Sequence, residues 1–263
     1  MQATSSCSGR GSAVAFGLAG WATVRASSDQ LAVLRKTPGL PADKTLSPGF
    51  LRNSDEQTVL ALAAISRAMV SMGRPTASFA NWGVVAAANS FGRSGTFQTL
   101  LDFRRDGAWG VTPHLIPHHS LHAISGTVSQ ALHIHGPNFG IGGGPSAVAE
   151  AFLAAATMIS DNNVPGLWVV LTGHDPECLP GASYQDAKPP IFCLAAAVAL
   201  EPLDNANYAS CLHISGVDHA PADWPELTLS DLLTMVESNV IAGRWSLPGC
   251  GWVVLGKAWE APR

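Results

Sequence analysis

The strongest constraint on the fold of this chain is the stretch from Asn138 to Ser146, where a short apolar strand runs through three glycines toward a helix. An Ala-rich apolar run predicts that helix over residues 147–159. Such a turn aims backbone N–H groups and the positive end of the helix dipole at one small volume, which suits an anion or an oxyanion. Many enzymes place a nucleophile here, but this chain has Pro145, which brings no nucleophile and lacks an N–H donor. The turn therefore predicts the architecture of a catalytic site without its nucleophile.

Apolar periodicity along the rest of the chain predicts alternating strands and helices. The expected strands cover residues 13–24, 82–88, 138–141, 167–171, 192–200, 209–215 and 251–256, and the expected helices cover 55–72, 96–105, 120–132, 147–159 and 227–240. Ser54 and Gln57 have the spacing of a capping box, with Ser54 as the N-cap of the first helix. Because a short polar link joins 192–200 to 209–215, we expect these strands to be antiparallel neighbours. The order predicts an α/β sandwich with a mixed sheet.

The composition of the chain limits which partners it can bind and in which compartment it is expected. With 263 residues, 47% of them hydrophobic, the chain can bury a sizeable core. Charged residues make up 13%, the net charge is −4 and no basic patch stands out, so we expect no nucleic-acid partner. The apolar run 13–24 is too short to span a bilayer and has no basic flank, so we expect no membrane span. The five scattered cysteines, with no Cys-x-x-Cys pair, favour a reducing, cytoplasmic location.

The histidines and glycines suggest a metal site and a dinucleotide-binding loop, but their spacing disfavours both. Six of the nine histidines lie between His114 and His135. His118, His119 and His122 would point in different directions at a helix start, and neither an HExxH motif nor an acidic ligand accompanies them, so we expect no metal site. The glycines of 140–144 lack the third glycine and the acidic residue of a dinucleotide loop, so we expect no cofactor.

A serine hydrolase site is an alternative. Ser146, Asp175 and His219 follow one another in the order of a hydrolase triad, although Val148 stands where a nucleophile elbow has its second glycine. The competing interpretation makes Ser146 the N-cap of the next helix, Asp175 a turn residue and His219 part of the tail. We favour the structural roles, and the hydrolase remains the alternative.

The run TPHLIPHHSLHAISGTVSQALHIHGPNFGIGGGPS, residues 112–146, resembles a segment of the β-ketoacyl synthases of the thiolase superfamily. In that family a Pro-rich approach leads into a helix, a Gly-Pro, a strand and then the active-site cysteine, whose position is taken here by Pro145. Residues 13–21, 88–92 and 168–175 also resemble the family's strands. The segment GHDPECLP, residues 173–180, is similar to the short chain-length-factor-type members that lack the cysteine.

The resemblance implies a thiolase-like α/β/α half with a five-stranded mixed sheet. It divides the chain into a flexible N-terminus (1–12), a ketosynthase-like N-terminal domain (13–216) and a C-terminal extension (217–263). The two histidines that assist decarboxylation in ketosynthases belong to a second half for which this chain offers no matching motif. The chain is therefore expected not to be a condensing enzyme.

The resemblance also implies partners and an interface. The expected role is a catalytically inactive subunit or scaffold in fatty acid, polyketide or aryl-polyene-like biosynthesis, with a ketosynthase or a second copy as its partner and an acyl carrier protein as a further one. The strand should pair across a two-fold axis, and the glycines after it should line what remains of an acyl channel. The residues concerned are Asn138, Phe139, Gly140, Ile141, Gly142, Gly143 and Gly144. A serine hydrolase or an acyl-binding module that uses Ser146 stays open beside this role.

Overall fold

The computed structural model describes residues 14–47, 49–88, 93–113, 115–142, 144, 146–162, 164–177, 192–203, 208–215, 220–238, 242–247 and 251–256. The strands are β1 (Val14–Ala26), β2 (Gly83–Ala88), β3 (Asn138–Gly142), β4 (Leu167–Asp175), β5 (Phe192–Pro202), β6 (Cys211–Ser215), β7 (Gly243–Leu247) and β8 (Gly251–Gly256). The α-helices are α1 (Ser28–Leu34), α2 (Glu56–Met72), α3 (Arg93–Asp106), α4 (Leu115–His119), α5 (His122–Leu132), α6 (Ala147–Asn162) and α7 (Leu229–Ser238), with 3-10 turns η1 (Thr76–Phe79) and η2 (Gly107–Gly110).

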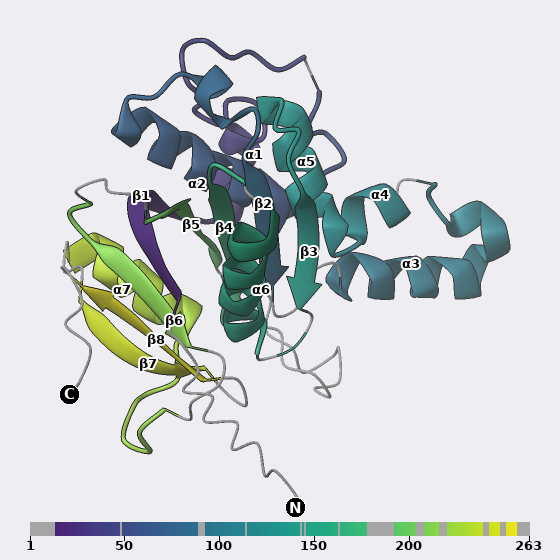
Figure 1. Cartoon of the computed structure of the whole chain (residues 1–263). Helices are drawn as coiled ribbons and strands as arrows, with labels where there is room; N and C mark the ends of the chain where they lie inside the picture. The colour runs from purple at the N-terminus through teal and green to yellow at the C-terminus, as the bar shows by residue number, and fades with distance from the viewer. Residues whose placement is uncertain are drawn as a thin grey trace, which may run out of the picture.

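The described strands form one mixed sheet between two layers of helices (Figure 1). Successive residues of a strand face opposite sides of a sheet, so the central strands feed two cores. Val84 and Trp168 pack with helices α2 and α5, whereas Val85 and Val169 pack with helices α6 and α7. The strand β4 is apolar without interruption from Leu167 to Leu171 and buried on both faces from Leu167 to Gly173, as expected for a central strand. The α/β class and the mixed sheet expected from the sequence are confirmed.

The sheet has eight strands among the described residues, so the expectation of five is wrong. The order across the sheet is β3-β2-β4-β5-β1-β6-β8-β7, and the three additional strands lie beyond β1. They are added because the beginning of β1, Val14 to Gly17, offers a free edge that pairs with β6. Apolar residues of these strands, such as Ile214 and Leu255, extend the core that contains α6 and α7.

The expectation that strands 192–200 and 209–215 are neighbours is also wrong. The strand β1 lies between β5 and β6 and is antiparallel to both. Because β1 is 13 residues long, its first part pairs with β6 while most of its length pairs with β5. The short link between β5 and β6 therefore crosses over one strand rather than forming a hairpin.

The helix α2 begins one residue later than the capping-box pattern predicts. Its N-cap is Asp55, whose Oδ1 accepts a hydrogen bond of 2.8 Å from the backbone N–H of Gln57. The carboxylate wins over Ser54 because it suits the positive end of the helix dipole. The helix ends at Gly73, which has the left-handed φ of 64° typical of a helix stop.

Candidate functional site

The turn between β3 and α6 lies at the carboxyl end of the three parallel strands. Gly142 is in register with Ala88 of β2, which is in register with Thr172 of β4. Gly142 has a φ of 100°, and a Cβ there would meet the Ala88 carbonyl oxygen at 2.9 Å, so the position needs glycine. The backbone N–H of Glu150 donates to the Ser146 carbonyl at 3.0 Å, which starts the helical bonding of α6. Gly143 and Pro145 lie outside the described residues.

The strand β3 is the edge of the sheet that is nearest to this turn. Helices α5 and α6 pack against its two faces. A Cβ on Gly140 would overlap the backbone of Leu121 at the start of α5, so only glycine allows this approach. Phe139 is 51% exposed, and no strand of the described chain pairs with the outer side of β3.

Of the three residues of the hydrolase alternative, the structure describes Ser146 and Asp175, while His219 lies outside the described residues. Asp175 is the last residue of β4 and is exposed. Its carboxylate accepts a hydrogen bond of 2.9 Å from the Arg25 guanidinium, which also lies 4.1 Å from the centre of the Phe192 ring. Asp175 therefore pairs with Arg25 of β1 in this structure.

Sequence reasoning missed a polar cluster near the carboxyl end of β4, on the face of the sheet that α2 covers. The Thr172 hydroxyl donates to Gln57 Oε1 at 2.8 Å, and the Gln57 amide lies 3.5 Å from His174 Nδ1. Asp55 Oδ2 lies 3.7 Å from His119 Nδ1, too long for a hydrogen bond but close enough for an ion pair. The carboxylate of Asp55 raises the pKa of His119. These contacts tie α2 to β4 and to α4, over sequence separations that no local pattern reveals.

Cys193 lies in this neighbourhood but is unsuited to replace the absent nucleophile. It is in register with His174 across β4 and β5, and it is 2% exposed. Burial raises the pKa of the Cys193 thiol, and the carboxylates of Asp55 and Glu56 raise it further. A buried thiol that stays protonated is a poor nucleophile.

Among the described residues, no group of three or more His, Cys, Asp or Glu is placed to hold a metal ion. None of the described helices is long and apolar enough to cross a bilayer.

Comparisons with known proteins agree with this architecture. Residues 42–165 match the family described as "Beta-ketoacyl synthase, N-terminal domain". A search of curated proteins found no match.

Solved structures share the fold at low sequence identity. A structure of a ketosynthase in complex with its chain length factor from Xenorhabdus doucetiae has a TM-score of 0.58 at 12% identity, covering 93% of this chain and 100% of that one. The ishigamide ketosynthase/chain length factor has a TM-score of 0.56 at 17% identity, covering 76% of this chain and 65% of that one. A type II polyketide synthase acyl-carrier protein in complex with its ketosynthase has a TM-score of 0.55 at 15% identity, covering 76% of this chain and 68% of that one. These similarities establish a thiolase-like α/β fold.

Proposed function

We propose that this chain is a chain-length-factor-type subunit that associates with a ketosynthase, because residues 42–165 match the N-terminal domain family of the β-ketoacyl synthases. It serves fatty acid, polyketide or aryl-polyene-like biosynthesis and does not itself catalyse condensation. The observation that carries the proposal is the open edge strand β3, which leads into a turn with proline at the nucleophile position.

The proline supports the absence of condensing activity on two counts. A condensing enzyme of this family holds its acyl group as a thioester on the cysteine, and Pro145 has no side-chain nucleophile. Proline also has no N–H to donate to an oxyanion. Since the nearby Cys193 is buried and protonated, it does not replace the missing thiol.

The open strand supports association. An unpaired edge exposes a row of N–H and C=O groups that a second strand can pair with. We propose that residues 138–142 pair antiparallel with the equivalent strand of a ketosynthase, and that Gly142 to Gly144 line the remainder of an acyl channel. A second copy of this chain is the alternative partner, and an acyl carrier protein is the expected third component.

Association is tested by co-purifying the chain with the ketosynthase encoded nearest to its gene and measuring Kd by sedimentation. Phe139→Lys places a charge on the open edge and is expected to weaken binding at least tenfold. Val33→Lys is the matched control, because Val33 is a similarly exposed apolar residue on α1, and its Kd should not change. A wild-type chain that stays monomeric at high concentration and retains no ketosynthase contradicts the proposal.

The chemistry is tested with the isolated chain and with Pro145→Cys. Neither should form a β-ketoacyl product from acyl- and malonyl-loaded carrier protein. A fluorophosphonate probe that labels the wild type but not Ser146→Ala would favour the serine hydrolase. An acyl chain bound without turnover would favour the acyl-binding module.

A further inference from the structure

The segment from α3 through η2 to α4, residues 93–119, forms an arm on the β3 side of the sheet. Figure 1 shows α3 and α4 extending away from the layered body. The helix α3 packs mainly on η2 and α4, and α4 packs on α5, which in turn covers β3. The root of the arm is held to α2 by the ion pair between His119 and Asp55. The arm thus leaves the body at the open edge of the sheet.

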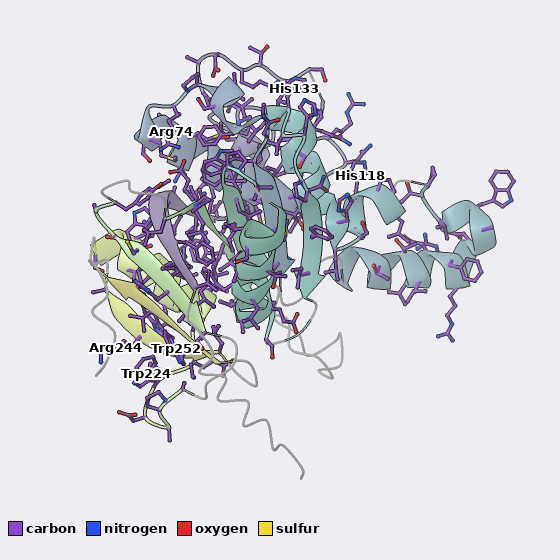
Figure 2. The ribbon with its side chains drawn as sticks, in the orientation of Figure 1. Arg74, His118, His133, Trp224, Arg244 and Trp252 are labelled. Atoms are coloured by element: carbon purple, nitrogen blue, oxygen red, sulfur yellow. The ribbon has the colours of Figure 1, made fainter. Side chains whose placement is uncertain are left out.

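Exposed apolar side chains gather on this side of the molecule. Among the described residues, nine large hydrophobic side chains are exposed, and six of them lie on the arm, at the start of α5 or on β3: Leu100, Leu101, Phe103, Trp109, Leu121 and Phe139. Leu100 is 61% exposed, Phe103 is 53% exposed and Trp109 is 98% exposed. The arm's side chains stand away from the rest of the molecule (Figure 2). Single exposed apolar residues are ordinary, but a group on one side marks an interaction surface.

The size of β3 indicates that the edge alone makes too small an interface. The strand has five residues. A stable complex buries roughly 800 Å² on each partner and uses about 20–30 residues a side. Among the described residues, the arm has exposed apolar side chains and packs on α5, which covers β3, so the arm can supply the remaining contact area.

We propose that the arm is the main apolar contact surface for the ketosynthase that pairs with β3, with Trp109 as its anchor and Leu100 and Phe103 beside it. This inference rests on the proposed function and extends it, because it names a second surface on the same partner. A tryptophan that presents nearly its whole side chain loses much apolar area to a partner, and tryptophan is enriched among the residues that dominate binding energy.

The test measures Kd for the same ketosynthase with Trp109→Ala and with the double variant Leu100→Ser/Phe103→Ser. Each should weaken binding about 30-fold or more, the size expected for an anchor residue. The matched controls are Val70→Ser on α2 and Leu203→Ser after β5, since both residues are exposed and apolar but lie outside the arm and β3. Their Kd should equal that of the wild type. Circular dichroism checks that every variant is folded.

The outcomes separate this inference from the proposed function. If Phe139→Lys loses the ketosynthase while the arm variants bind like the controls, the arm is not part of the interface and the inference is overturned alone. If the wild type binds no ketosynthase, the proposed function fails and the inference with it. If the arm variants dissociate only a complex between two copies of this chain, the partner named here is wrong.

Discussion

The strand β7 at one edge of the sheet is covered by the chain's own segment 224–227, whereas β3 at the opposite edge has no described segment bonded along it. The backbone N–H of Ser246 donates to the Pro225 carbonyl at 2.7 Å, and the N–H of Leu227 donates to the Ser246 carbonyl at 3.2 Å. The Ser246 hydroxyl adds a bond of 3.3 Å to the Trp224 carbonyl. Because these bonds occupy the outward N–H and C=O groups of Ser246, less of this edge is free to pair with another chain.

Aromatic contacts hold this cover in place. Trp224 packs edge-on against Trp252 of β8 with ring centres 6.2 Å apart, and the Arg244 guanidinium lies 5.9 Å from the Trp224 ring centre (Figure 2). On the β3 side, by contrast, the aromatic residues Phe139 and Trp109 are exposed. The two edges of the described sheet therefore differ, and this difference supports the proposed pairing of β3 with a partner strand.

The largest effect is expected from Gly140→Ala on β3. The added methyl group would overlap the Leu121 backbone, so α5 or β3 must move, at a cost of roughly 3 kcal/mol. Urea unfolding measures the change in the free energy of unfolding. Gly144→Ala is the control, because no described atom lies within 4 Å of the added methyl group, and its change should stay below about 0.5 kcal/mol. Equal effects at the two glycines would show that α5 does not hold the open strand in place.

A smaller effect is expected from Trp224→Ala at the closed edge. Losing the contacts with Trp252 and Arg244 should cost about 1–2 kcal/mol and loosen the cover of β7. Light scattering should then detect new self-association, while the Kd for the ketosynthase stays unchanged. Trp109→Ala is the matched tryptophan variant. It should raise the Kd for the ketosynthase without changing the free energy of unfolding. If both variants behave alike in both measurements, the two edges do not differ in the way we describe.

Local patterns in the sequence predicted the helices and strands far better than they predicted which strands lie next to one another in the sheet. The apolar run of β4, the helices α2 and α6, and even the late strand β8 follow from periodicity over a few residues. The place of β1 between β5 and β6 depends on pairing over long sequence separations, which no local pattern specifies. Of the three additional strands, β6 and β8 were predicted one by one, but β7 (Gly243–Leu247) was not, and no local pattern predicted that the three belong to the same sheet.

The candidate site likewise has features that the local sequence predicts and features that depend on contacts between distant residues. The need for glycine at position 142 could be predicted from the strand-to-helix turn, because its φ of 100° is a local property of the backbone. The need for glycine at position 140 depends on the approach of the Leu121 backbone, which no local pattern reveals. The contacts of side chains could not be predicted either, since Asp175 meets Arg25 across 150 residues and Thr172 meets Gln57 across 115. Ser54 failed as an N-cap because a carboxylate one residue later competes for the same helix start.

The smallest expected effect concerns the root of the arm. Asp55 raises the pKa of His119, so the stabilisation from their ion pair is fully present below the ordinary histidine pKa of 6.5 and is lost as the pH rises through the raised value. The free energy of unfolding of the wild type should therefore fall relative to that of His119→Gln over this range, by under about 1 kcal/mol. Burial lowers the pKa of His213, but both proteins share that effect and it cancels in the difference. Hydrogen exchange in α4 should rise with pH in the wild type more than in the variant, and identical pH profiles would show that this ion pair does not hold the arm beside the open edge.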